Sequence, residues 1–191
     1  MKTAIFGGSF NPVHNGHLAL AATVLDRTPY RRVLFVPAAA PPHKTLAAGA
    51  SDEDRLAMLS IALGGLEGAE VWPGELRREG PSYTIDTVEQ LLSEGLVEGR
   101  PGLVIGSDLV AGFGDWRRSG DLIAMTEVIL AERDGTPAAP PFPCLRLENP
   151  EWPYSSTEVR DAIARGGDLA SVVPPGVAAY IEEKGLYGYA K

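Results

Sequence analysis

The architecture of this chain follows from one stretch near its start, Ile5-Phe6-Gly7-Gly8-Ser9-Phe10-Asn11-Pro12-Val13-His14-Asn15-Gly16-His17-Leu18-Ala19-Leu20. The apolar run from Thr3 to Phe6 predicts a strand, and the glycine pair with Asn11-Pro12 predicts a turn. Helical spacing begins at His17. A strand, a tight turn and a helix start form the place where open α/β sheets bind phosphates, because N–H groups at a helix N-terminus are free to meet an anion.

The residue types in this turn fit that prediction. Gly7 and Gly8 let a ligand approach the backbone closely, and His14 and His17 bring two imidazoles to the same turn. One such histidine alone is as well explained by a solvated or core side chain, but two that flank a glycine here favour phosphate chemistry. The stretch is neither a Walker loop, since no Lys-Ser/Thr ends it, nor a G-x-G-x-x-G fingerprint.

Strand-like and helix-like runs alternate along the whole chain, which predicts a parallel α/β fold. Ser51 and Ser155 are expected to cap helices, the charged segment 75–80 to be solvated, and 134–143 to be a surface linker. The expected strands are 3–6, 32–36, 69–72, 103–105, 127–131 and 144–147. The expected helices start at His17, Ser51, the Ser82–Thr87 region, Ser155 and Pro174, and end near Asp26, Leu63, Glu94, Arg165 and Gly185.

Composition limits the classes of function. The 191 residues suit one domain, with a helical part from about residue 155 to the end. The net charge of −8 gives no basic footprint for nucleic acid or for a membrane surface. The single cysteine, Cys144, forms no internal disulfide, and no signal peptide or long apolar span is visible, so we expect a cytoplasmic protein. Local positive charge for a polyanion must come from a few residues: Lys44, Arg117, Arg118 and Arg160.

Further candidate groups follow the later strands. Gly106 and Asp108 lie beside the first turn if strands 3–6 and 103–105 are neighbours, and Asp108 then either accepts from a ribose or caps the next helix. Trp116 either packs in the core or stacks on a flat ring. Residues 155–160 form a second helix N-terminus with hydroxyls and an arginine, a ready anion site.

Several of these motifs resemble one known family. The run G-G-S-F-N-P-V-H-N-G-H resembles the G-G-x-F-x-P-x-H-x-G-H signature of the nucleotidylyltransferase superfamily, and is most similar to the bacterial nicotinate-nucleotide adenylyltransferases. Asn11 stands where that family often has Asp. The family's I-G-x-D, P-H-K and I-S-S-T-x-I-R elements resemble segments 105–108, 42–44 and 154–160, with Tyr154 and Val159 as departures. Ser82–Thr87 resembles the family's element at the pyridine ring, and Trp116 the tryptophan that follows I-G-x-D.

This resemblance implies a Rossmann-like, doubly wound parallel sheet of the nucleotidyltransferase type. It implies transfer of the adenylyl group of ATP to nicotinate mononucleotide, with Mg²⁺ held mainly by the phosphates. The implied ATP-binding residues are Gly7, Gly8, Ser9, Phe10, His14, His17, Gly106, Asp108, Ser155, Ser156, Thr157 and Arg160. The implied mononucleotide-binding residues are Ser9, His43, Lys44, Tyr83, Thr84, Trp116 and Arg117, with the backbone of Thr84 and Arg117 at the nicotinate carboxylate. The implied catalytic residues are His14, His17, Lys44 and Arg160.

Three other functions compete with this one. A phosphopantetheine adenylyltransferase or a cytidylyltransferase would share the first turn but not Ser82–Thr87 with Trp116. A nucleotide sensor on the same fold would not need the histidines, Lys44 or Arg160. A metallohydrolase could use His14, His17 and His43 but lacks the expected carboxylates. The choice between acid and amide substrate, and between a monomer and a homo-oligomer, stays open.

Overall fold

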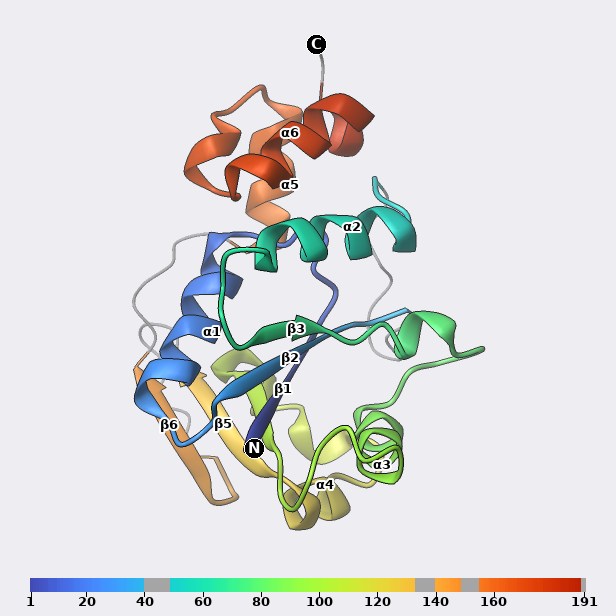
Figure 1. Cartoon of the computed structure of the whole chain (residues 1–191), viewed down its shortest axis with the longest axis vertical. Helices are drawn as coiled ribbons and strands as arrows, with labels where there is room; N and C mark the ends of the chain where they lie inside the picture. Colours follow the sequence, from blue (N-terminus) through green and yellow to red (C-terminus); the bar gives the residue numbers. More distant parts are fainter. Residues whose placement is uncertain (40–48, 133–139, 149–154, 190–191) are drawn as a thin grey trace.

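The strands form one parallel six-stranded sheet in the order β3-β2-β1-β4-β5-β6 (Figure 1). The computed structural model describes residues 1–39, 49–132, 140–148 and 155–189. The strands are β1 Thr3–Gly8, β2 Arg32–Pro37, β3 Ala69–Val71, β4 Gly102–Gly106, β5 Glu127–Glu132 and β6 Cys144–Glu148. The order reverses at β1, which pairs with β2 on one side and β4 on the other. The predicted doubly wound sheet is therefore confirmed. Its first and fourth strands are neighbours, which is the condition on which the placement of Gly106 and Asp108 beside the first turn depended.

Helices cover both faces of the sheet. The α-helices are α1 Asn15–Arg27, α2 Asp52–Leu63, α3 Thr84–Ser93, α4 Ser119–Met125, α5 Ser156–Ala164 and α6 Pro175–Lys184. Short 3₁₀ turns are η1 Glu75–Arg77, η2 Ser107–Leu109, η3 Phe113–Asp115, η4 Leu169–Ser171 and η5 Leu186–Gly188. Because side chains alternate along a strand, Phe6 of β1 joins a core with α1, α2, α5 and α6, whereas Ile5 joins a second core with α3 and α4.

The local signals that start helices α2 and α5 are confirmed. The Asp54 N–H donates to the Ser51 hydroxyl over 3.1 Å, and the Glu158 N–H donates to the Ser155 hydroxyl over 3.3 Å. In both helices the acidic side chain at the third position returns a hydrogen bond to the cap's own backbone N–H, which completes a capping box.

Four details of the predicted fold are wrong. Helix α1 begins at Asn15 rather than His17, because His14 and His17 act as its cap pair. No helix was predicted over Ser119–Met125, where the structure has α4. Phe142, in the expected surface linker, is buried against Phe113 with 4.6 Å between ring centroids; residues 133–139 of that linker lie outside the described residues. Glu75, in the charged segment 75–80 that was expected to be solvated, is only 7% exposed.

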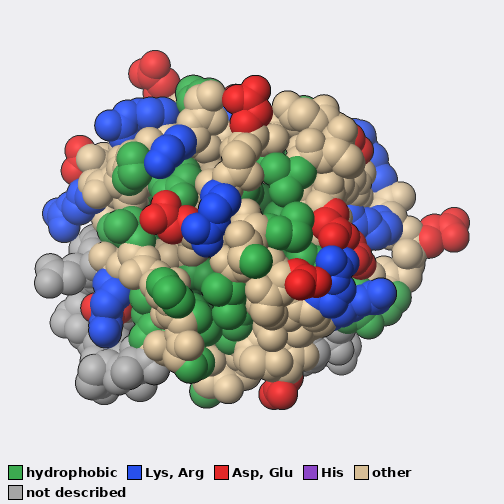
Figure 2. All heavy atoms as spheres, turned by 90° about the horizontal axis from the view of Figure 1, so that it is seen from below, with side chains coloured by type: hydrophobic (Ala, Val, Ile, Leu, Met, Phe, Trp, Pro, Cys, Tyr) green, Lys and Arg blue, Asp and Glu red, His purple; other side chains and the backbone are tan. Residues whose placement is uncertain are grey.

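The described surface agrees with the charge balance. On the face seen in Figure 2, Lys and Arg side chains are interspersed with Asp and Glu instead of forming one basic patch. Within the ranges that the structure describes, no helix is both long enough and apolar enough to cross a bilayer.

Candidate active site

The candidate site lies where β1 and β4 end side by side. Phe6 of β1 pairs with Val104 of β4, so the Gly7-Gly8-Ser9 turn and the Ile105–Asp108 turn leave the same edge of the sheet. This is the topological switch point, where the strand order reverses and the outgoing connections separate. A cavity of roughly 530 Å³ opens there, and Gly7, Gly8, Ser9 and Asp108 contribute to its lining.

The two glycines of the first turn serve different purposes. A Cβ atom built at Gly7 meets nothing within 4 Å, on a residue that lines the cavity, so Gly7 leaves room for a ligand. A Cβ at Gly8 would lie 3.0 Å from Cζ of Phe10, so Gly8 leaves room for the turn itself. The Phe10 side chain folds back under the turn and packs on Phe6 and Phe35 with centroid distances of 5.5 and 5.4 Å.

His14 and His17 lie at the start of α1, directly after this turn. Their ring centroids are 3.7 Å apart, and the backbone N–H of His14 donates to Nδ1 of His17 over 3.2 Å. A neutral imidazole that accepts at Nδ1 carries its proton on Nε2. His17 therefore presents a donor nitrogen of the kind that phosphate oxygens accept, beside the N-terminus of a helix.

The second predicted anion site lies against the first. The Ser156 hydroxyl donates to the carbonyl of Pro12 over 3.2 Å, and Nη1 of Arg160 donates to the carbonyl of Asn11 over 2.7 Å. Nη2 of Arg160 donates to the Thr157 hydroxyl over 3.1 Å, which orients the guanidinium along α5. The N-termini of α1 and α5 are thus held together, with Ser155, Ser156, Thr157 and Arg160 on one side and the histidines on the other.

The far part of the cavity is aromatic. Trp116 is half-buried and stacks on Phe113, with a centroid distance of 5.0 Å and an interplanar angle of 29°. The Arg117 guanidinium lies 4.7 Å from the centroid of the Tyr83 ring. Tyr83, Thr84, Trp116 and Arg117 all line the cavity. Trp116 therefore packs on the core through Phe113 and also borders the cavity, where a flat ring could stack on it.

Asp108 is not a helix cap. The cap of η2 is Gly106, and Asp108 lies inside that turn as an exposed residue on the cavity lining. A Cβ at Gly106 would collide with the Asp108 carboxylate, so the glycine allows this carboxylate to lie close to the strand end. His43 and Lys44, the remaining predicted residues, lie outside the described residues.

Glu75 is a functional candidate that was not recognised from the sequence. Glu75, expected to be solvated, is only 7% exposed and lines the cavity. It accepts a hydrogen bond from the Thr87 hydroxyl over 2.5 Å. Burial raises the pKa of this carboxyl, while Thr87, Arg78 and Ser82 act in the opposite direction. Its residue type gave no hint of burial; its place after a strand, at the edge of the sheet where ligands bind, was the available signal.

The metallohydrolase alternative finds no support in the described part of the chain. Those residues contain no group of three or more His, Cys, Asp and Glu side chains placed to hold a metal ion. The donors gathered at the site are backbone N–H groups, imidazoles, hydroxyls and guanidinium groups, which suit phosphate oxygens.

Comparison with known proteins identifies the family. A family model described as cytidylyltransferase-like matches residues 5–162. A Geobacillus thermodenitrificans protein described as "Probable nicotinate-nucleotide adenylyltransferase" is 39% identical over 187 residues, which cover 98% of this chain and 86% of that protein. A Gloeobacter violaceus protein of the same description is 38% identical over 198 residues, covering 97% and 96%.

A solved structure agrees on the fold. Plasmodium falciparum nicotinic acid mononucleotide adenylyltransferase, complexed with NaAD, matches with a TM-score of 0.79 at 19% identity and covers 100% of this chain and 99% of its own. The two sequence relatives support assignment to a family, whereas this structure supports the fold alone, because the relatives are twice as similar in sequence over nearly the full chain. This chain belongs to the nicotinate-nucleotide adenylyltransferase family of nucleotidyltransferases.

Proposed function

We propose that this protein transfers the adenylyl group of ATP to nicotinate mononucleotide, giving nicotinate adenine dinucleotide and pyrophosphate. The observation that carries the proposal is the continuity of the site. One cavity runs from the glycine pair at the end of β1 to Trp116 and the start of α3, so a mononucleotide phosphate and its pyridine ring can be bound at once.

In this reaction a phosphate oxygen of the mononucleotide attacks the α-phosphorus of ATP. The new phosphorus–oxygen bond forms as the bond to the β-phosphate breaks, and pyrophosphate leaves. The attacking group is already an anion, so no general base is needed. The protein's task is to position the reactants and to stabilise charge that moves onto the leaving oxygens.

The described residues suit these tasks. The first turn with His14 and His17 would bind the α- and β-phosphates, and Arg160 with the start of α5 would bind the departing pyrophosphate. We also expect Lys44 to act near the phosphates. ATP would enter as its magnesium complex, and the ion would neutralise phosphate charge when bound.

The pyridine end would be selected by its shape and by backbone donors. The indole of Trp116 would stack on the pyridinium ring. The N–H of Thr84, in the first turn of α3, and the backbone of Arg117 would meet the nicotinate carboxylate, since the first N–H groups of a helix have no partner within the helix. The use of ATP and the single cysteine support a cytoplasmic location.

The test is pyrophosphate release with ATP and Mg²⁺, with nicotinate mononucleotide, nicotinamide mononucleotide and phosphopantetheine compared side by side. We expect strong preference for the first. Preference for the amide would keep the chemistry but contradict the roles of Thr84 and Arg117. Turnover with phosphopantetheine alone would mean that Ser82–Thr87 was misinterpreted, and no turnover with any substrate would favour a nucleotide sensor.

A further inference from the structure

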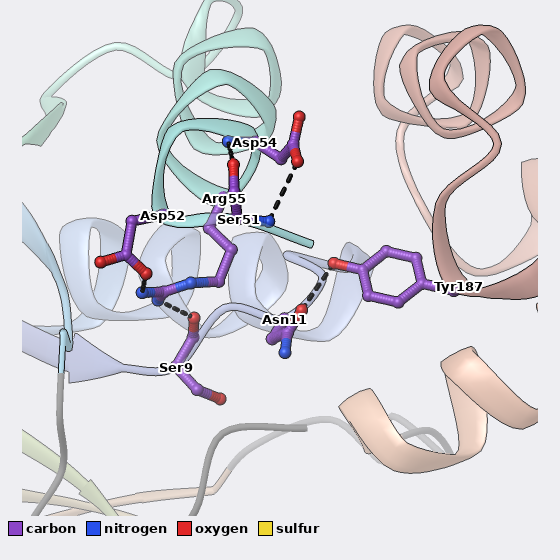
Figure 3. Close-up of polar contacts among 7 residues, drawn as sticks. All are labelled: Ser9, Asn11, Ser51, Asp52, Asp54, Arg55 and Tyr187. Atoms are coloured by element: carbon purple, nitrogen blue, oxygen red, sulfur yellow. Dashed lines mark hydrogen bonds and ion pairs between the residues drawn. The ribbon is translucent and has the colours of Figure 1, made fainter. Parts of the chain in front are cut away.

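Two buried side chains, Arg55 and Tyr187, donate hydrogen bonds to residues of the first turn (Figure 3). Neither of them lines the cavity. Arg55 on α2 is 1% exposed. Its Nη1 donates to the carbonyl of Ser9 over 2.7 Å, and its Nη2 pairs with the Asp52 carboxylate over 2.6 Å. A buried arginine is costly unless it is paired, so this guanidinium is committed to the turn and to its own helix.

Tyr187 on η5 is the second. Its hydroxyl donates to Oδ1 of Asn11 over 2.7 Å, across 176 positions of the chain. Burial raises the pKa of this hydroxyl, with Arg160 and Arg55 acting in the opposite direction, so it remains a protonated donor at neutral pH. Arg160 binds the backbone carbonyl of the same asparagine. Asn11 is therefore fixed at both its side chain and its backbone by the C-terminal part of the chain.

The direction of these bonds has a consequence for anion binding. The C=O and the N–H of a trans peptide unit point in opposite directions. When Arg55 fixes the carbonyl of Ser9, it also fixes the direction of the N–H of Phe10. Residues 9–12, which follow β1, belong to no helix or strand, so side chains supply the hydrogen bonds that hold their peptide groups. Donors held in place before the ligand arrives stabilise charge without a reorganisation cost.

We propose that Arg55 and Tyr187 are positioning residues for adenylyl transfer: they hold the first turn in the geometry in which its N–H groups and histidines meet the nucleotide phosphates. The inference rests on the function proposed above and extends it. It gives η5 a role in positioning the active-site turn, through the hydrogen bond from Tyr187 to Asn11.

The first test is Tyr187→Phe, which removes only the hydroxyl. We expect kcat to fall about 10-fold, the effect of about one net hydrogen bond, while KM for nicotinate mononucleotide stays within about twofold, because its ring would bind at the other end of the cavity. Tyr180→Phe is the matched control. The Tyr180 hydroxyl donates to Asp54 on α2 over 2.9 Å and does not contact the turn, so its removal should leave kcat unchanged.

The second test is Arg55→Lys beside Arg55→Met, assayed below the melting temperature of each variant. Lysine keeps the charge and can reach one oxygen, so it should retain more of kcat than methionine. Arg32→Lys is the control, because Arg32 likewise pairs with a carboxylate, Glu70, and donates to a carbonyl, that of Leu96, far from the turn. We expect little change in its kcat.

Three outcomes would overturn the inference: an unchanged kcat in Tyr187→Phe, equal losses in Tyr187→Phe and Tyr180→Phe, or KM for the mononucleotide rising as much as kcat falls. An inactive wild-type protein would instead contradict the proposed function. The two failures are therefore distinguishable, since the inference is judged only by comparing variants with an active parent.

Discussion

One added methyl group should stabilise this protein at Gly7 and destabilise it at Gly8. Replacing glycine by alanine stabilises by about 0.4–1 kcal/mol when the backbone tolerates it, because the unfolded chain loses freedom. At Gly7 a Cβ meets nothing within 4 Å, so this gain should be realised in full. For a protein of this size it corresponds to a rise in melting temperature of about 1–4 °C.

At Gly8 the same methyl would lie 3.0 to 3.3 Å from three atoms of the Phe10 ring. That ring is fully buried and packs edge-on against Phe6, with an interplanar angle of 85°, so it has little room to move. Overpacking a core costs about 1–3 kcal/mol. Alanine also stabilises the protein by restricting the unfolded chain, as at Gly7. Subtracting that stabilisation from the middle of the overpacking range leaves a net destabilisation of about 1 kcal/mol, which lowers the melting temperature by about 2–4 °C.

Activity should not follow stability in this pair. The methyl of Gly7→Ala enters the cavity where the ligand would approach the backbone, so we expect KM for nicotinate mononucleotide or ATP to rise about 10-fold in a better-folded protein. Thermal melts and pyrophosphate release on both variants provide the measurement. The reasoning is refuted if Gly7→Ala melts as early as Gly8→Ala, or if Gly7→Ala leaves both KM values at the wild-type level.

Three further predictions concern the site and its support. His17→Ala should lower kcat about 100-fold, as the loss of a donor to developing charge does, with less effect on mononucleotide binding; equal effects on both, measured by kinetics and titration, would exclude that role. Trp116→Ala should raise KM for nicotinate mononucleotide by roughly 2- to 10-fold through lost stacking, with Trp116→Phe in between, and a parallel rise in KM for ATP would argue against it. Glu75 has a raised pKa when folded, so between the ordinary glutamate value and the raised one the folded state binds more protons than the unfolded state, and stability falls as pH rises. Urea unfolding across that range should show the fall in the wild type and not in Glu75→Gln, and superimposable profiles would contradict the assignment.

The sheet could be predicted from the sequence because its signals are local. The apolar runs at Thr3–Phe6 and Leu103–Ile105 each end in a glycine-containing turn, and both are followed by the polar residues of the site. Parallel strands in a doubly wound sheet present these turns at one edge. Once these two strands are neighbours, as they are in the structure, their turns bring Gly7 and Asp108 to the same cavity.

The burial of Glu75 and Arg55 could not be predicted from the sequence, because the groups that enclose these side chains are distant in the sequence. Glu75 lies in a charged segment, and its partner Thr87 is 12 positions away on α3. Arg55 follows three acidic residues at the start of α2, and its partner carbonyl, that of Ser9, is 46 positions earlier. Charged side chains are mostly exposed, so only the tertiary structure shows that these two are enclosed.

The first turn shows the same division between local and distant information. Its sequence supplies the chemical groups, namely the glycines and the two histidines. Its conformation depends on side chains from two later helices, α2 and α5, because the carbonyls of Ser9, Asn11 and Pro12 accept hydrogen bonds from Arg55, Arg160 and Ser156. An anion site made of backbone N–H groups functions only when those groups point to one place. In the proposed function, the turn would therefore bind phosphates only with α2 and α5 packed beside it, so the geometry of the active site depends on the packing of these two helices.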